Sequence, residues 1–291
     1  MLTDDATATA GPAEITTAEV QTGIWETLSG AAVSLLGPPN VVMQLARLPV
    51  GHGVAKSKVD SGRADLHPFK RARTTFSYLT IALLGTDAER RTYRAEVNRA
   101  HKLVHSEPGD PVEYNAFDKE LQLWVAACLF VGGEQAIDLF YPGYLDQRPG
   151  FRDAYYSHCS RLGTTLQVPE EMWPSSRADF QMYWDENLAR IEMDDVSRTY
   201  LLNLISLSEL PVKVPRAVGR HHRFMVTGFL EEPFREQLGL SWTPADATRH
   251  ARLARRTASL ARITPGPIRR FPMNAFHRDT QRRIRSGRPI V

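Results

Sequence analysis

Apolar residues recur three and four positions apart along almost the whole chain, and no stretch alternates convincingly between apolar and polar residues. This spacing places the apolar side chains on one face of an α-helix, whereas alternation is typical of a half-buried β-strand. The pattern therefore predicts an all-α fold. The expected helices cover residues 17–36, 40–56, 68–85, 87–106, 116–131, 133–140, 149–162, 176–193, 195–209, 212–227, 231–238, 244–263 and 274–286.

The expected helices are separated by short segments rich in Gly and Pro, such as GPPN at 37–40 and EPGDP at 107–111. The 291 residues are 42% hydrophobic and 24% charged, which is ordinary for a globular chain with one sizeable core. No repeat or long linker divides the chain. We therefore expect a disordered N-terminus over 1–15, one all-helical domain over 16–275 and a basic C-terminal tail over 276–291.

Several classes of site and location are excluded by what the chain lacks. Cys128 and Cys159 are too few for a disulfide framework, and the absence of C-x-x-C-H rules out covalently attached haem. No nucleotide-binding glycine loop, H-E-x-x-H or G-x-S-x-G motif occurs. The start is acidic and polar, unlike a secretory signal, and the longest strongly apolar stretch, about a dozen residues around Trp124, is short for a membrane span. These features predict a cytoplasmic protein without a transmembrane segment.

Arginine is dense from Arg249 to Arg288, where Asp279 is the only acidic residue. Such a region could meet nucleic acid, an anionic membrane surface or the carboxylates of a cofactor. The favoured interpretation is a solvated helix face followed by a loose basic tail. We therefore expect no nucleic-acid partner, while peripheral contact with a membrane stays open.

The segment 86–106 carries the first candidate ligand. On a helix, Tyr93, Val97, Ala100 and Val104 form one apolar stripe. His101 lies about 70° from the centre of this stripe and is the better candidate to point inward, whereas His105 lies about 110° away. A neutral inward imidazole is the usual axial ligand of a b-type haem, although a lone histidine on an apolar face is more often a hydrogen-bonded core residue.

The preceding helix adds a second group of candidates. Arg71 and Thr75 are i,i+4 neighbours, and Tyr78, Leu79 and Ala82 continue their face. A permanently charged guanidinium beside apolar side chains needs a partner, such as a haem propionate, bound dioxygen or a carboxylate. The alternative is an arginine that extends to the surface.

The order of motifs resembles that of the mpaB-type and latex-clearing (rubber) oxygenases. The similar segments are Q-L-A at 44–46, R-x-x-x-T at 71–75, GTDAER at 85–90, V-x-x-x-H at 97–101, YNAFDKELQLWV at 114–125, Met182-Tyr183-Trp184 and FLEEPFREQLGLSW at 229–242. The likeness runs from about residue 20 to 275, and its specificity lies in the order and spacing of the pieces.

The resemblance implies an all-helical fold around one non-covalent haem b, with His101 as the axial ligand of the iron. It further implies that Arg71 and Thr75 lie in the distal pocket as catalytic residues, and Arg71 is also a candidate to contact the cofactor. Trp124 is most often a core residue, with a smaller chance of lining the haem cavity. The implied partners are dioxygen and a hydrophobic small molecule, for example an isoprenoid or another alkene. Counting from Thr75 without a gap selects His105 instead as ligand, so this residue stays a second candidate.

Three positions depart from the family pattern. Arg47-Leu48-Pro49 stands where many relatives have a histidine–proline pair, and Ala126 follows Trp124-Val125 where relatives often have histidine. Latex-clearing proteins also carry an upstream glutamate and a lysine before the threonine, where this chain offers only Asp60, Asp65 and Thr74. Rubber cleavage is therefore less expected than haem binding.

Three functions are consistent with these features. The leading one is a haem-dependent oxygenase that acts on a hydrophobic small molecule. The second is a haem-binding protein without oxygenase turnover, such as a sensor, a carrier or a peroxidase-like scavenger. The third is a cofactor-free helical protein whose arginine-rich region docks on acidic partners. The substrate, the electron donor and the oligomeric state do not follow from the sequence.

Overall fold

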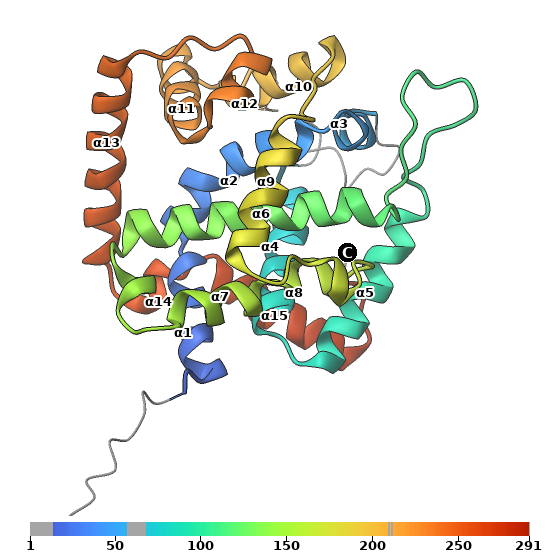
Figure 1. The fold of residues 1–291 in the computed structure, drawn as a ribbon, viewed down its shortest axis with the longest axis vertical. Coiled ribbons are helices and arrows are strands. Elements are labelled where there is room, and N and C mark those ends of the chain that lie inside the picture. The colour runs from blue at the N-terminus through green and yellow to red at the C-terminus, as the bar shows by residue number, and fades with distance from the viewer. Residues whose placement is uncertain (1–13, 57–67, 209, 211, 291) are drawn as a thin grey trace, which may run out of the picture.

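The computed structural model describes residues 14–56, 68–208, 210 and 212–290, and within these ranges the chain forms one all-helical domain with no β-strand (Figure 1). Its elements are α1 (Thr17–Thr27), α2 (Gly30–Leu45), α3 (Leu48–Ala55), α4 (Pro68–Leu84), α5 (Asp87–His101), α6 (Lys119–Phe140), η2 (Tyr144–Asp146), α7 (Phe151–Cys159), α8 (Arg161–Thr164), η3 (Glu170–Met172), α9 (Arg177–Leu188), α10 (Asp195–Ser206), α11 (Arg216–Phe229), α12 (Glu232–Gln237), α13 (Pro244–Arg262), α14 (Gly266–Arg269) and α15 (Met273–Ser286). The predicted all-α class is thus confirmed.

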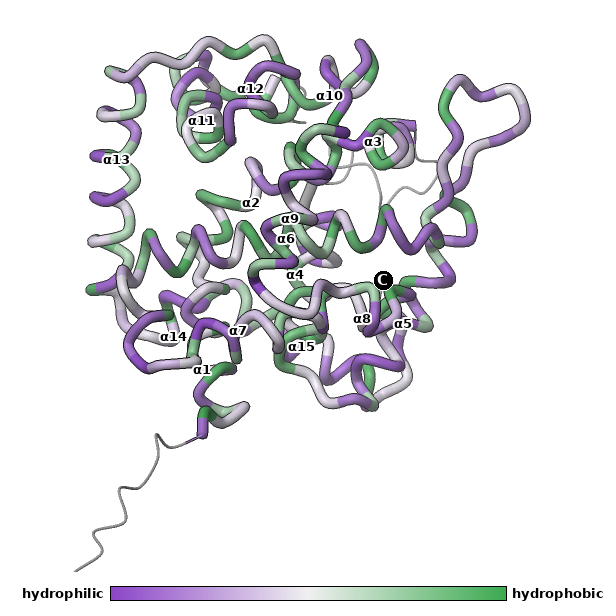
Figure 2. Tube along the Cα trace, in the orientation of Figure 1, coloured by the Kyte–Doolittle hydropathy of each residue, from purple (hydrophilic) through white to green (hydrophobic). Residues whose placement is uncertain are grey.

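The long helix α6 runs through the middle of the molecule and packs against α1, α2, α8 and α13 (Figure 1). It begins at Asp118, whose carboxylate accepts the backbone N–H groups of Glu120 (2.8 Å) and Leu121 (3.1 Å). Figure 2 shows the helix as mainly hydrophobic. By length and composition α6 could cross a membrane, but 56% of the residues in its apolar window are buried inside this protein, as in the core helix of a globular domain.

The predicted break between residues 131 and 133 is wrong, because α6 continues through Gly132 and Gly133. These glycines allow close packing instead of ending the helix. A Cβ atom on Gly132 would lie 2.3 Å from Nδ2 of Asn40, and one on Gly133 would lie 2.9 Å from the hydroxyl of Tyr155. The Asn40 amide donates to the carbonyl of Cys128 at 2.5 Å and so joins α2 to α6.

The predicted break at 37–40 is also wrong, since α2 passes through Pro38 and Pro39. A proline inside a helix removes one backbone hydrogen bond, which normally favours a break. Here the buried face of α2, pressed against α6, outweighs that preference. The actual break lies earlier, at Leu28 and Ser29, where the Ser29 hydroxyl accepts the N–H of Ala32 at 3.1 Å and starts α2.

Helix α5 ends at His101, five residues before its predicted end. It begins at Asp87, as expected, and is preceded by a capping box in which Thr86 and Glu89 bond each other's backbone N–H groups. After His101 the chain turns away, and Ala116 N–H donates to the Val104 carbonyl at 2.9 Å. Residues 102–118 therefore form a loop, not another turn of helix. The other predicted helices appear with ends shifted by a few residues or divided by short turns.

The two ends of the chain differ in how much is described. The predicted disordered segment 1–15 lies outside the described residues except for Glu14 and Ile15. In the C-terminal segment 276–291, α15 packs against α4, and Ile290 is buried with Ile81 and Tyr93. Both cysteines are free and buried.

Candidate functional site

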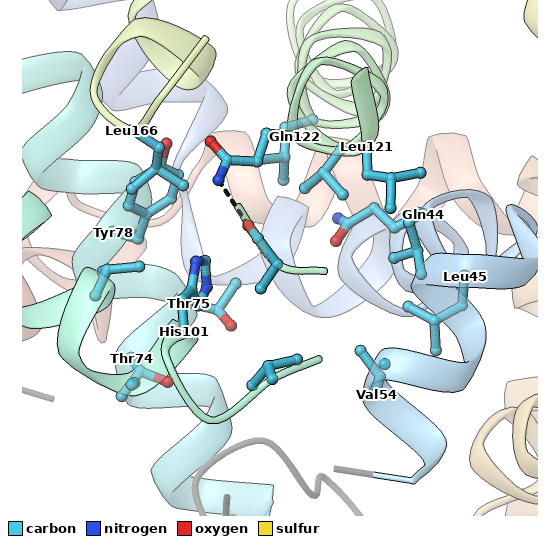
Figure 3. A pocket seen from close by; sticks show the side chains of 18 of the residues that line it. Gln44, Leu45, Val54, Thr74, Thr75, Tyr78, His101, Leu121, Gln122 and Leu166 are labelled. Carbon is cyan, nitrogen blue, oxygen red and sulfur yellow. Dashed lines mark hydrogen bonds between the residues drawn. The ribbon is translucent and has the colours of Figure 1, made fainter. Parts of the chain in front are cut away.

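A pocket of about 270 Å³ lies between α2, α3, α4, α5, α6 and α8 (Figure 3). Most of its lining is apolar. The walls are formed by Gln44, Leu45, Pro49, Val50, Gly53, Val54, Arg71, Thr74, Thr75, Tyr78, Tyr93, Val97, Ala100, His101, Val104, Tyr114, Asn115, Ala116, Leu121, Gln122, Val125, Leu129, Leu162, Gly163 and Leu166. A pocket with this lining suits a largely apolar ligand.

Helix α4 presents one face to this cavity. Arg71, Thr74, Thr75 and Tyr78 are spaced three and four residues apart, so they follow each other along one side of the helix. The Thr74 hydroxyl donates to the backbone carbonyl of Arg71 at 2.9 Å, and the Tyr78 hydroxyl donates to that of Leu162. No described residue forms a hydrogen bond with the Thr75 hydroxyl, which leaves it available to a ligand.

The stripe on α5 lines the same cavity through Tyr93, Val97 and Ala100, with His101 beside it at the C-terminal end of the helix. Figure 3 shows His101 and Thr75 on one side of the cavity and Leu45 and Val54 across from them. The capped start of α5 at Thr86 fixes the register that brings His101 to the cavity wall.

The His101 ring is positioned as an uncharged nitrogen donor. Its Nδ1 atom is buried and has no hydrogen-bond partner among the described residues. Burial, and secondly the positive charge of Arg71, lower the pKa of His101 to about 4. The imidazole is therefore neutral at pH 7 and keeps a lone pair. The ring of Phe117 meets it edge-on, with ring centroids 6.1 Å apart.

Arg71 brings a positive charge to this mostly apolar wall. Burial lowers the pKa of its guanidinium, and within the described part of the chain no carboxylate lies at ion-pair distance. Tyr93, close to Arg71, donates its hydroxyl to the Thr74 carbonyl at 2.8 Å. A guanidinium in this setting favours an anionic or strongly polar group in the cavity.

The opposite wall comes from α6 and α2. Leu121, Val125 and Leu129 are four residues apart on α6 and form a continuous apolar strip. Next to them, the Gln122 amide donates to the Ala116 carbonyl and to Gln167, both at 2.7 Å. Since these bonds tie the loop 102–118 to α6, they hold the cavity wall in place. Sequence reasoning missed this wall, although the i,i+4 spacing of the strip was a usable signal.

Among the described residues no three His, Cys, Asp or Glu side chains converge on a point where a metal ion could bind.

The buried histidine His52 was not singled out from the sequence. Its Nε2 atom lies 2.6 Å from the carboxylate of Asp194, which caps α10. The pair joins α3 to α10, while the Nδ1 atom of His52, like that of His101, is buried and has no hydrogen-bond partner among the described residues.

The comparison with known protein families gives a match over residues 25–262 to the catalytic domain described as ER-bound oxygenase mpaB/B′/rubber oxygenase. The chain belongs to this family. It is also 42% identical over 257 residues to uncharacterized proteins of Mycobacterium tuberculosis and Mycobacterium bovis, an alignment that covers 88% of this chain and all of each relative. No solved structure matches the chain.

The residues expected from the mpaB/rubber oxygenase resemblance do not all reach the cavity. Arg71, Thr75 and His101 line it together. Trp124 does not: its indole N–H donates to the Gln44 carbonyl at 3.0 Å, and its ring stacks on Trp184 at 5.2 Å in the core. His105 is exposed in the loop, where it pairs with Asn115 in an isolated bridge. Asp60 and Asp65 lie outside the described residues.

Proposed function

We propose that this member of the mpaB/rubber oxygenase family is a haem b-dependent oxygenase that uses dioxygen to oxidise a hydrophobic small molecule, such as an isoprenoid or another alkene. The observation that carries the proposal is His101: a neutral imidazole with an unpaired, buried Nδ1 atom at the wall of an apolar cavity. A buried nitrogen without a partner is costly unless a ligand supplies one.

The donor set fits a haem better than a bare metal ion. A haem brings four nitrogen ligands of its own and needs one axial group from the protein, commonly a histidine. The described residues offer one inward imidazole at the cavity and no cluster of three metal ligands. His101 would hold the iron, and the apolar strip of Leu121, Val125 and Leu129 would contact the macrocycle or the substrate.

Arg71 and Thr75 supply the polar groups of the proposed site. The Arg71 guanidinium, without a carboxylate partner among the described residues, would bind a haem propionate or hold a polarised oxygen atom by charge. The Thr75 hydroxyl would donate a hydrogen bond to such an oxygen. Both lie on the same face of α4, so the helix orients them toward one ligand.

When bound, a ferrous haem supplies the electrons that activate dioxygen for transfer to a substrate. The protein contributes a water-poor cavity, in which hydrogen bonds and charges act more strongly than in water. The same apolar walls select a substrate without charged groups. Thr74 stands where latex-clearing proteins carry lysine, and its hydroxyl is used by the backbone of α4. This difference from the latex-clearing proteins argues against rubber cleavage.

The proposal is tested on protein purified from cells supplied with a haem precursor. We expect about one haem b per chain by pyridine haemochrome analysis, and uptake of dioxygen when an isoprenoid alkene and a reductant are added. Haem without any alkene-dependent oxygen uptake would favour a haem-binding protein that does not turn over. A preparation that never contains haem would overturn the proposal.

A further inference from the structure

One region of the surface combines exposed apolar side chains with uncompensated positive charge. Leu260, Ile263, Ile268 and Phe271 have exposed fractions of 66%, 80%, 66% and 62%. They lie within twelve consecutive residues: Leu260 at the end of α13, Ile263 directly after it, Ile268 in α14 and Phe271 between α14 and α15. Single exposed apolar residues are common, but four large ones in one short segment are not. We call these four side chains the α13–α14 apolar tip.

The charge around this tip is strongly one-sided. From residue 247 to 278 the sequence contains eight arginines and no acidic residue. Arg269 and Arg270 are paired with the Glu26 carboxylate at 2.8 and 2.9 Å. By contrast, the exposed arginines along α13 have no carboxylate at ion-pair distance within the described chain; they are Arg252, Arg255, Arg256 and Arg262. Their charge therefore faces solvent.

Helix α13 has the amphipathic form expected of such a surface. Its inner face, with Ala254, Ala258 and Ala261, is buried, while its arginines project outward. Figure 2 shows hydrophilic and hydrophobic residues mixed along α13, in contrast to α6. Apolar side chains that enter a bilayer, with arginines at the level of the headgroups, are the typical arrangement of a protein that lies on an anionic membrane.

We propose that the α13–α14 apolar tip and the arginines of α13 bind the surface of a membrane that contains anionic lipids. Charge complementarity favours an anionic surface, and the four large aliphatic and aromatic side chains favour a lipid interior over nucleic acid. In Figure 1, α13 and α14 lie at one edge of the molecule, and α3 and α5, which line the cavity, lie toward the opposite edge. The tip would therefore tether the protein without blocking the cavity. The inference does not depend on the proposed oxygenase function.

The test is sedimentation of the full chain with vesicles of phosphatidylcholine alone or mixed with phosphatidylglycerol. We expect binding to the mixed vesicles, weakened by salt, and little binding to phosphatidylcholine alone. The double variant Ile263→Glu/Ile268→Glu should lose binding. The matched control Met182→Glu/Val212→Glu changes side chains that are 59% and 65% exposed elsewhere and should bind normally. Arg255→Gln/Arg256→Gln should weaken binding on the order of tenfold.

Failure of the wild-type protein to sediment with anionic vesicles would overturn the proposal, as would equal binding by the Ile263/Ile268 variant. A third result is that the wild-type protein does not bind vesicles but forms a concentration-dependent dimer, which the Ile263/Ile268 variant does not form. The tip would then be an interface between two copies of the chain. Thermal melts check that each variant is folded. Haem content and oxygen uptake, measured in parallel, keep this result separate from the oxygenase proposal.

Discussion

The pKa of His101, about 4, gives this residue a defined effect on stability in the haem-free protein. An unfolded histidine has a pKa near about 6.5, so between these values the unfolded chain binds the proton more readily than the folded chain. The free energy of unfolding should therefore fall as the pH drops from about 6.5 to 4. The contribution of His101 reaches at most about 3 kcal/mol.

The variant His101→Gln should show a shallower loss of stability in urea unfolding measured at pH 7, 6 and 5. Burial also lowers the pKa values of His158, His250 and His277, so some dependence on pH should remain. An identical loss in the variant and the wild type would mean that folding does not lower the pKa of His101.

Two neighbouring threonines on α4 offer a matched test of the hydroxyl that we propose to contact oxygen. Thr75→Val removes a hydroxyl without a partner among the described residues and keeps the side-chain volume. If that hydroxyl donates to an oxygen during turnover, alkene-dependent oxygen uptake should fall about tenfold, with haem content unchanged. Thr74→Val removes a hydroxyl that bonds the backbone of α4 and should change the rate little. Equal rates in both variants would remove Thr75 from the mechanism.

At the scale of elements, α3 is placed against α10 by a glycine. A Cβ atom on Gly51 would lie 2.6 Å from the Ser197 Oγ and 2.9 Å from the Leu45 carbonyl. One on Gly53, two residues later in the same helix, would only touch the Tyr114 ring at 3.4 Å. Gly51→Ala should therefore destabilise the protein by about 1–3 kcal/mol, since the crowding exceeds the gain in helix propensity.

Gly53→Ala should keep the stabilisation of up to about 1 kcal/mol that alanine brings to a helix through its higher helix propensity. Thermal unfolding of the two variants compares them directly, because both replace a buried glycine in α3. A Gly51→Ala protein that melts at or above the wild-type temperature would contradict the close contact between α3, Leu45 and Ser197.

The sequence predicted those helix boundaries that are determined by neighbouring residues and missed those that are determined by packing against distant helices. The start of α5 at Asp87 and the α4 and α5 stripes follow from residues within one or two turns, and these features were predicted. The continuation of α2 through Pro38 and Pro39 depends on packing against α6, which no local pattern contains. The same holds for the end of α5, where bonds to residues 114–116 draw the chain away.

The same distinction holds for the candidate site: residues marked by the spacing on their own helix were predicted, and those set by contacts between helices were not. The spacing on α4 and α5 indicated Arg71, Thr75 and His101, because each lies beside a stripe on its own helix. Trp124 was weighed as most often a core residue, with a smaller chance of lining the cavity, and it lies in the core, about 100° around α6 from Val125, which lines the cavity. Which face of α6 meets the cavity is set by its contacts with α2 and α8, and these are tertiary.

At the scale of the whole molecule, the cavity connects segments from residue 44 to residue 166. A ligand that binds only the folded chain stabilises it by mass action. Haem at about 100 times its Kd should therefore raise the melting temperature by roughly 5–10 °C. Metal-free protoporphyrin IX, which cannot bind the His101 nitrogen, should give a smaller shift. Equal shifts with both compounds would indicate that the cavity holds the porphyrin without ligating iron.

The most direct measurement is the absorption spectrum of the oxidised and dithionite-reduced protein beside the variants His101→Ala and His105→Ala. We expect a Soret band and a b-type pyridine haemochrome in the wild type. The band should be lost or strongly altered in His101→Ala and unchanged in His105→Ala, whose side chain is exposed outside the cavity. A haem band that survives His101→Ala would contradict the assigned ligand, and the absence of haem from every preparation would contradict the account as a whole.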